Sequence, residues 1–359
     1  MRNMIRKSVA QMKAYVPGEQ ASGPDLVKLN TNENPYPPSP RIAEFLSTVS
    51  IDRLRLYPDP VCSELRRELG NLHGCGPEQI FVGNGSDEVL ALSLRAFVER
   101  DGTVGFFDPS YSLYPVLAAI EELSTRPVLL REDYQWSMPE DYNSSIFLLT
   151  NPNAPTSLTF PGKRIKAFCE RTAGVVVTDE AYGDFCGEKN VALALCLDNV
   201  LVVRTLSKSY ALAGIRLGYA VGPPELIQAL YKIKDSYNVS WMTQKIARIA
   251  IQDQDYLQTI LKKIIVTRSR ISRALTEKGF EVFPSSTNFL WIRPRGNSAK
   301  SIFEGLREQK ILVRHFPGPR TEAFLRVTVG TDEQMDQFLA GLDRVQPTDS
   351  IDIGKCPRT

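Results

Sequence analysis

Three apolar runs of this 359-residue chain are each followed by a polar side chain that could take part in chemistry. Asn151 comes after SIFLL, Asp179 after GVVV and Lys208 after VLVV, at intervals of 28 and 29 residues. Such an interval suits a strand, a helix and the next strand, so the three side chains are expected at one carboxyl edge of a parallel sheet, where open α/β folds bind ligands. Each residue alone is typical of a turn or cap. Their coincidence favours a functional site.

Lys208 lies in TLSKSYALAG, between an apolar run and small residues, which allows either an exposed loop lysine or a partly desolvated one. Desolvation favours the neutral amine that attacks carbonyl carbons. Because the chain has only two histidines, catalysis is expected to use lysine, arginine, aspartate, tyrosine or a cofactor. Asp179 is the candidate acid for a cofactor ring nitrogen, since a protonated pyridine ring is an electron sink.

A glycine-containing turn, GNGSDEVL, leads from a predicted strand into a predicted helix. Free amides at Gly85, Ser86 and Asp87 could hold a phosphate at the positive end of that helix. Ordinary capping would explain the same residues. The segment around the lysine adds a hydroxyl at Ser207 and a cation at Arg216, which strengthens the phosphate interpretation.

Further candidates are aromatic, amide and guanidinium groups. The ring of Tyr111 either stacks on a planar cofactor or fills the core. Tyr182 and Asn151 can both donate to a phenolate oxygen. Arg314 and Arg326 lie in predicted strands of one sheet, flanked by apolar residues, and this pairing favours an anion site.

Positioning these groups requires a layered α/β domain. Strands are predicted at residues 80–82, 103–107, 145–149, 174–177, 200–203 and 217–221, with helical patterns between them. After residue 223 long helical segments run to about residue 278. Strands near 288–292, 311–314 and 324–329 then indicate a smaller α+β domain. The proline-rich segment 30–60 is expected to be an ordered arm, and the polar tail from residue 346 a frayed extension.

Composition limits the functional classes. There are 43 basic and 41 acidic residues and no polybasic block, so no nucleic-acid partner is predicted. No apolar stretch approaches the ~18 residues that span a bilayer, and the first residues lack an apolar signal core, so a cytoplasmic protein is predicted. Six scattered cysteines without a CxxC pair indicate neither a metal site nor a disulfide framework.

Taken together, the motifs resemble the fold-type I, pyridoxal-phosphate-dependent aminotransferases, and among them the histidinol-phosphate aminotransferases. The resemblance runs over nearly the whole chain. It rests on TNENPYPPSP, RLYPDP, GNGSDEVL, DPSYSLYPV, TNPNAPT, VVTDEAYGDF, RTLSKSYALAGIRLGYAVG, DSYNVS, SSTNFL, ILVRHF and LRVTVGTDEQ. The chain departs from the usual NPNNPTG, which here reads NPNAPTS, and from the usual PYG, which here reads PYPP. Neither departure removes an implied catalytic group.

The resemblance implies catalytic roles for three residues. Lys208 would bind the cofactor, pyridoxal 5'-phosphate, covalently and also move the substrate's proton. Asp179 would pair with the ring nitrogen, and Tyr182, with Asn151, would hold the phenolate oxygen. Tyr111 would stack on the ring.

It also implies binding roles. The cofactor phosphate would be held by Gly85, Ser86, Asp87, Ser207 and Arg216, together with Tyr57 of the partner subunit in a homodimer. The anionic group of the substrate would be bound by Tyr15, Asn32, Arg314 and Arg326. Glu33 belongs to the same NEN segment and receives no role.

The expected fold is a mixed, mainly parallel seven-stranded large domain over residues 45–236. A small domain would be formed by residues 1–44 and 237–359. The implied reaction passes the amino group of glutamate to imidazole-acetol phosphate, giving histidinol phosphate in histidine synthesis. An aromatic amino-acid aminotransferase and a threonine-phosphate decarboxylase are the enzymatic alternatives. A cofactor-sensing regulator would need a DNA-binding extension, for which too few residues precede the arm.

Overall fold

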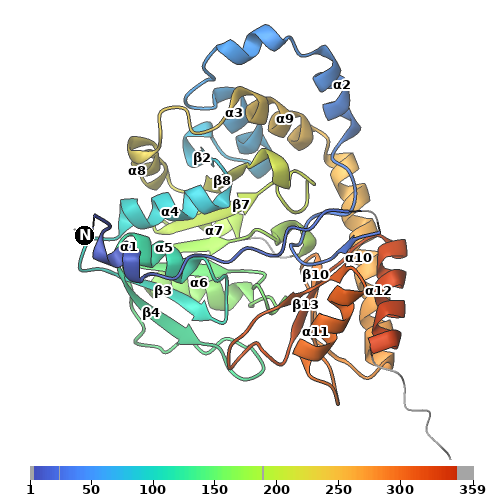
Figure 1. Ribbon diagram of the computed structural model, residues 1–359. Coiled ribbons are helices and arrows are strands. Elements are labelled where there is room, and N and C mark those ends of the chain that lie inside the picture. The colour runs from blue at the N-terminus through green and yellow to red at the C-terminus, as the bar shows by residue number, and fades with distance from the viewer. Residues whose placement is uncertain (1–3, 24, 188–189, 346–359) are drawn as a thin grey trace, which may run out of the picture.

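The computed structural model describes residues 4–23, 25–187 and 190–345 of the chain (Figure 1). The polar tail from residue 346 lies outside the described residues, and so does the prediction made for it. In the described part, no helix is long and apolar enough to cross a membrane.

A seven-stranded sheet forms the centre of the molecule, in the order β2-β8-β7-β6-β5-β3-β4. Its strands are β2 (Ile80–Gly83), β3 (Thr103–Asp108), β4 (Ser124–Leu129), β5 (Ile146–Thr150), β6 (Val175–Asp179), β7 (Val200–Thr205) and β8 (Gly218–Val221). Only β8 runs antiparallel to its neighbours, β2 and β7. The other pairs are parallel, which confirms the mixed, mainly parallel sheet expected from the sequence.

Helices cover both faces of this sheet, which is why its central strands are apolar at almost every position. Alternate strand residues contribute to two separate cores: Val177 and Leu201 belong to one, Val176 and Val202 to the other. The first core takes in side chains of α4 (Ser86–Phe97), α5 (Tyr114–Ile120) and α8 (Pro224–Ile233). The second takes in α6 (Gly162–Arg171) and α7 (Val191–Cys196).

A second sheet, in the order β12-β13-β10-β9, is built from the C-terminal part of the chain. Its strands are β9 (Glu281–Val282), β10 (Phe289–Arg293), β12 (Arg314–His315) and β13 (Leu325–Thr328). The helices around it are α10 (Gln254–Glu277), α11 (Ala299–Glu308) and α12 (Asp332–Val345). The N-terminal segment joins this part through β1 (Val27–Lys28), which pairs in parallel with β11 (Ile311–Leu312). The predicted domain boundaries at residues 44/45 and 236/237 stay predictions.

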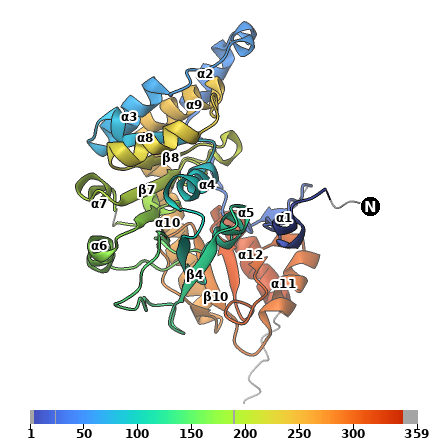
Figure 2. The same ribbon diagram turned by 90° about the vertical axis from the view of Figure 1, so that its left-hand side faces the viewer.

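The remaining helices lie at the two ends of the large sheet. α2 (Pro40–Thr48), α3 (Ser63–His73) and α9 (Trp241–Gln252) pack together at the end far from the second sheet (Figure 2). The short helix α1 (Lys7–Gln11) lies against α5. Short 3₁₀ helices occur at η1 (Ile51–Arg55), η2 (Pro77–Gln79), η3 (Gly183–Phe185) and η4 (Ala213–Ile215).

The strands differ from the expectation in several places, and the two-residue strands β1 and β9 were not predicted. β4 was not predicted, because STRPVL has no apolar alternation: it is an edge strand with mostly exposed side chains, and Pro127 is tolerated there. The single strand expected over residues 311–314 is divided, because β11 pairs with β1 and β12 pairs with β13. The division turns Arg314 towards Arg326, its Cα partner across the β12–β13 pair.

Candidate active site

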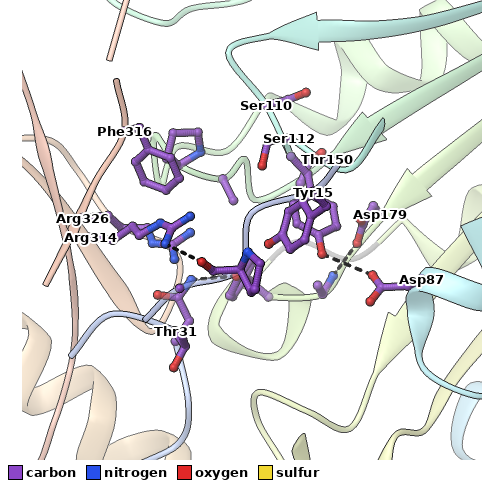
Figure 3. Close-up of a pocket in the computed structure, with 18 of the residues that line it drawn as sticks. Tyr15, Thr31, Asp87, Ser110, Ser112, Thr150, Asp179, Arg314, Phe316 and Arg326 are labelled. Carbon is purple, nitrogen blue, oxygen red and sulfur yellow. Dashed lines mark hydrogen bonds between the residues drawn. The ribbon is translucent and has the colours of Figure 1, made fainter. Parts of the chain in front are cut away.

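A cavity of about 530 Å³ opens where the carboxyl ends of β5, β6 and β7 meet the N-terminal segment and the second sheet (Figure 3). Twelve residues proposed from the sequence line it: Tyr15, Asn32, Ser86, Asp87, Tyr111, Asp179, Tyr182, Ser207, Lys208, Arg216, Arg314 and Arg326. Gly85, Asn151 and Tyr57 do not line this cavity. Because β5, β6 and β7 are parallel neighbours, the spacing of 28 and 29 residues read from the sequence does bring their carboxyl ends together.

Asp179 ends β6 and is only 3% exposed. Its Oδ2 accepts from the Tyr114 hydroxyl at 2.9 Å, and its Oδ1 accepts from the Ala181 amide at 3.1 Å. Neither partner is charged. Burial therefore raises the pKa of Asp179 to about 6, although both hydrogen bonds act in the opposite direction. The carboxylate suits a positively charged group placed in the cavity.

Lys208 follows β7 and reaches into the same cavity. Burial lowers the pKa of Lys208 to about 8, and the positive charge of Arg326 lowers it further. Its Nζ donates to the Thr31 carbonyl at 3.1 Å. A lysine in this state supplies far more neutral amine near pH 8 than an exposed lysine does.

The backbone around the lysine is fixed from two sides. Asn34 Nδ2 donates to the carbonyls of Lys208 and Ser209, at 3.1 and 3.0 Å. The Ser209 hydroxyl donates to Asp184 at 2.5 Å, and Asp184 pairs with the buried Arg204 at 3.1 Å. This network ties the loop after β6 to the loop after β7. Sequence reasoning missed Asn34, Asp184 and Arg204, although all three stand inside the quoted motifs.

The first turn of α4 provides a place for a phosphate. No side chain caps this helix at Gly85, whose φ of 84° is in the left-handed region that favours glycine. A Cβ at Gly85 would lie 2.5 Å from Arg216 Nη2, and one at Gly218 would lie 2.2 Å from the Ser86 amide nitrogen. Ser207 faces Arg216 across 3.4 Å. Amide, hydroxyl and guanidinium donors therefore converge where added side chains would fill the space.

Tyr182 and Asn32 form a buried pair at another wall of the cavity. Asn32 Nδ2 donates to the Tyr182 hydroxyl at 2.8 Å, and Asn32 Oδ1 accepts from Thr328 at 3.1 Å. Burial raises the pKa of Tyr182, so its hydroxyl stays a proton donor at neutral pH. Asn151, directly after β5, is buried and uses its Oδ1 to accept from the Phe160 amide.

Aromatic residues close the cavity above the α4 turn. The Tyr111 hydroxyl donates to Asp87 Oδ1 at 3.2 Å, and burial raises the pKa of Tyr111. Tyr15 meets the Tyr111 ring edge-on at a centroid distance of 6.1 Å. The two rings come from segments almost a hundred residues apart, and Figure 3 shows Tyr15 on the same side of the cavity as Asp87.

Arg314 and Arg326 lie side by side at the opposite wall (Figure 3). Arg314 donates to the carbonyls of Val16 and Pro17, at 2.8 and 3.0 Å, and so holds the N-terminal segment that carries Tyr15. Arg326 donates from Nη2 to the Asn30 carbonyl at 3.0 Å. Its buried Nε has no hydrogen-bond partner within the described part of the chain. Burial lowers the pKa of Arg326, as does the charge of Arg314.

Tyr57 lies outside this cavity. It is 77% exposed and stacks on Tyr237 with ring centroids 4.4 Å apart. It lines a second cavity of about 640 Å³, which shares Arg216 with the first. The predicted contact of Tyr57 of the partner subunit with a cofactor phosphate stays a prediction.

These features fit pyridoxal 5'-phosphate. Asp179 offers a buried carboxylate without a cationic partner, Lys208 an amine of lowered pKa, and the α4 turn a set of donors for a phosphate. When bound, this cofactor supplies an electron sink for breaking bonds at the substrate's amino-bearing carbon. With the cofactor bound, the carboxylate of Asp179 would favour a protonated ring nitrogen, and Lys208 would be placed to move the substrate's proton.

Comparison with known proteins supports the same conclusion. Residues 24–342 match the family model "Aminotransferase class I and II". The chain is 42% identical to a histidinol-phosphate aminotransferase of Citrifermentans bemidjiense, over 96% of this chain and 99% of that protein. It is 43% identical to one of Chromohalobacter salexigens, over 94% of this chain and 97% of that protein.

Solved structures share the fold. The histidinol-phosphate aminotransferase of Sinorhizobium meliloti, in complex with pyridoxal-5'-phosphate, superposes with a TM-score of 0.85 at 24% identity, covering 96% of this chain and 98% of that one. The L-threonine-O-3-phosphate decarboxylase of Porphyromonas gingivalis gives 0.77 at 21% identity, covering 88% and 98%. One fold thus carries more than one reaction. On the family match and the close sequence relatives, the chain belongs to the class I and II aminotransferases, and it is a pyridoxal 5'-phosphate-dependent transaminase.

Proposed function

We propose that the protein transfers an amino group between L-histidinol phosphate and 2-oxoglutarate. Glutamate and imidazole-acetol phosphate form the other substrate pair, and the step belongs to histidine biosynthesis. The observation that carries the proposal is the pair Arg314 and Arg326 in the cavity that holds Lys208 and Asp179. Both substrates have an amine beside an anionic group, and rigid guanidinium groups bind either a carboxylate or a phosphate. Relatives at 41–43% identity that are named histidinol-phosphate aminotransferases support this choice.

Each residue then has a definite task. Lys208 binds the cofactor and exchanges the proton at the substrate carbon that bears the amine. Tyr182, held by Asn32, donates to the ring oxygen, and Tyr111 lies against the ring. The α4 turn holds the cofactor phosphate, and Tyr15 with the two arginines holds the substrate anion. These roles are part of the proposal.

A panel of amino donors with 2-oxoglutarate tests the substrate. We expect turnover with histidinol phosphate to exceed turnover with phenylalanine and with threonine phosphate. Preferential turnover of phenylalanine would identify an aromatic amino-acid aminotransferase. Release of carbon dioxide from threonine phosphate without amino transfer would identify the decarboxylase.

Removing either arginine tests the anion site. Arg314→Ala and Arg326→Ala are each expected to lower kcat/KM in both half-reactions, because a lost charged hydrogen bond costs roughly 1.5–3 kcal/mol, or about 10- to 150-fold. The loss should be larger for histidinol phosphate, whose phosphate carries nearly two charges. Arg326→Lys keeps the charge but not the planar fork, so it should impair both half-reactions as well.

Arg293→Ala is the matched control. Arg293 belongs to the same sheet, pairs with Glu281 and does not line the cavity. The two half-reactions are followed separately by cofactor absorbance. Unchanged kcat/KM for both substrates in both alanine variants would remove the arginines from the site. A loss confined to glutamate would favour an aromatic amino-acid aminotransferase.

The proposal includes a homodimer with shared sites. Ile51, Leu54, Leu56 and Tyr57 form an exposed apolar segment beside the second cavity. Burying such a surface is favourable, and a second copy of the chain is the partner that suits it. The partner subunit's Tyr57 would then reach the phosphate place next to Arg216. We also place the enzyme in the cytoplasm, where free thiols such as Cys62 and Cys169 persist.

Mixed dimers test this arrangement. A Tyr57→Phe chain paired with a Lys208→Ala chain has one site with both lesions and one with neither, if sites are shared. Activity should then exceed that of both parent homodimers and approach that of a wild-type/Lys208→Ala heterodimer, the control. Isolated heterodimers no more active than half of the Tyr57→Phe homodimer would show that each Tyr57 serves its own chain.

A further inference from the structure

Two like charges face each other at the anion end of the cavity. Arg314 and Arg326 are direct Cα partners on neighbouring antiparallel strands, where like-charged side chains destabilise a sheet. The charge of Arg314 contributes to the lowered pKa of Arg326, so the two guanidinium groups do act on each other. Other groups of the protein must therefore hold the two guanidinium groups side by side when no anion lies between them.

Hydrogen bonds account for only part of this. The two recorded bonds of Arg314 go to carbonyls of the N-terminal segment, Val16 and Pro17. Arg326 makes one recorded bond, to the Asn30 carbonyl, and its buried Nε has none within the described part of the chain. A guanidinium with five N–H donors is therefore held at one corner, which does not fix the direction of its plane.

One aromatic ring contacts both cations. The Arg314 guanidinium carbon lies 5.3 Å from the centroid of the Phe316 ring, and that of Arg326 lies 5.1 Å from the same centroid. Both distances are within the ~6 Å over which an aromatic face attracts a cation. Phe316 itself lines the cavity, and Figure 3 shows its ring beside the two arginines.

The ring is supported from behind. Phe316 packs on the fully buried Trp291 with a centroid distance of 6.1 Å. Phe289, also fully buried, lies 5.3 Å from the Arg326 guanidinium and covers it too. Arg326 is thus in contact with two rings, one from the core and one from the cavity wall, whereas Arg314 is over Phe316.

We infer that Phe316 is a positioning residue that holds both guanidinium groups in place for a dianionic phosphate. This inference rests on the proposed function, since it concerns how that function's substrate is selected. The negative ring face offsets the repulsion between the arginines and fixes their planes before the anion arrives. A phosphate that carries nearly two charges and meets both arginines depends on this arrangement more than a carboxylate with one charge does.

The test measures the two half-reactions by cofactor absorbance in Phe316→Leu. Because the arginines bind the anion in the ground state and the transition state alike, KM should rise with kcat nearly unchanged. We expect KM for histidinol phosphate to rise roughly 5- to 30-fold, and KM for glutamate to rise less. Phe316→Tyr keeps the ring face and should restore the wild-type KM.

Phe324→Leu is the matched control. Phe324 lies under Arg293 at 5.5 Å and stacks on the same Trp291, but it does not line the cavity. It should lower the stability of this sheet without raising KM. If Phe316→Leu fails to fold, stepwise fluorination of the Phe316 ring weakens its attraction for cations while keeping its shape, and KM should rise with each fluorine.

The outcomes separate the inference from the function it rests on. An unchanged KM in folded Phe316→Leu, a loss confined to kcat, or an equal KM rise in Phe324→Leu would overturn the role of Phe316 while leaving the reaction intact. Failure of the wild-type protein to use histidinol phosphate would overturn the proposed function. Even then, a rise of KM for glutamate in Phe316→Leu and with ring fluorination would support the ring as the holder of the arginines.

Discussion

Lys208→Ala is expected to abolish transamination, with a fall in kcat of about 10⁴-fold or more, because in the proposed mechanism one amine supplies both the covalent link to the cofactor and the proton transfer. The structure gives the reason for choosing this lysine. Lys208 lines the cavity, and burial lowers its pKa to about 8 from the ordinary 10.5. At pH 7 that shift makes the neutral amine about 300-fold more abundant.

Two measurements check Lys208 independently of turnover. Borohydride reduction of the yellow holoenzyme should fix the cofactor to the peptide that contains Lys208. In cofactor-free protein, the rate at which an amine reagent labels Lys208 should reach half its maximum near pH 8. Lys28, which is in an ion pair with Glu33 and does not line the cavity, is the control lysine. A label on another lysine, or a midpoint for Lys208 near 10.5, would contradict the assignment.

The parts of the site that were predictable from the sequence are those fixed by local pattern. Asp179 and Lys208 end or follow apolar strands at an interval that suits one strand-helix-strand step, and the structure has those strands as parallel neighbours. The glycine turn before α4 was predictable as a helix start, but its phosphate role could be inferred only together with Ser207 and Arg216, because ordinary capping explains the same residues. The second sheet was predictable only in part, since strands as short as β12, with two residues, leave no periodicity to read.

Contacts between distant segments could not be predicted from the sequence. The hydrogen bond from Asn32 to Tyr182 joins residues 150 positions apart, and the hold of Asn34 on the Lys208 backbone joins residues 174 apart. The role of Phe316 could not be predicted, because an aromatic residue close to an arginine in a strand is usually a core residue. Only the register of β12 and β13 shows that a second arginine, Arg326, lies beside Arg314. Such roles follow from packing, which one-dimensional spacing does not contain.

The second large effect on kcat is expected from replacing Asp179, the buried carboxylate that ends β6. Asp179→Asn should retain bound cofactor but lose roughly 10²- to 10⁴-fold in kcat. A neutral amide no longer favours the protonated ring nitrogen, so the electron sink is lost. Near-normal turnover in this variant would rule out the pairing of Asp179 with the ring.

Asp179→Asn should also stabilise the cofactor-free protein, because burial makes the ionised form of Asp179 unfavourable. Its pKa is raised to about 6 by burial, against an ordinary 3.8. Between pH 4 and 6 the folded state then binds more protons than the unfolded state, so this residue's contribution to stability falls as pH rises through that window. Above pH 6 the ionised carboxylate costs about 3 kcal/mol in the absence of a cationic partner.

Asparagine can keep the local hydrogen bonds. Its carbonyl accepts from the Ala181 amide in place of Oδ1, and its amide donates to the Tyr114 oxygen once the Tyr114 proton turns to Thr150, which lies 2.6 Å away. Only the charge is removed. Cofactor-free Asp179→Asn should therefore unfold at a higher urea concentration than the wild type at pH 7.5, and the difference should vanish near pH 4.

Asp184→Asn separates this effect from a general response to removing a buried acid. Asp184 lies five residues further along, where it pairs with Arg204 and accepts from Ser209, so its loss should destabilise the protein.

Adding pyridoxal 5'-phosphate should reverse the order of the urea midpoints of wild type and Asp179→Asn. The protonated ring nitrogen would then give the carboxylate of wild-type Asp179 a cationic partner. On this reasoning Asp179 would lower the stability of the cofactor-free protein and contribute to activity once the cofactor is present. Equal urea midpoints for cofactor-free wild type and Asp179→Asn at pH 7.5 would show that the carboxylate is not strained.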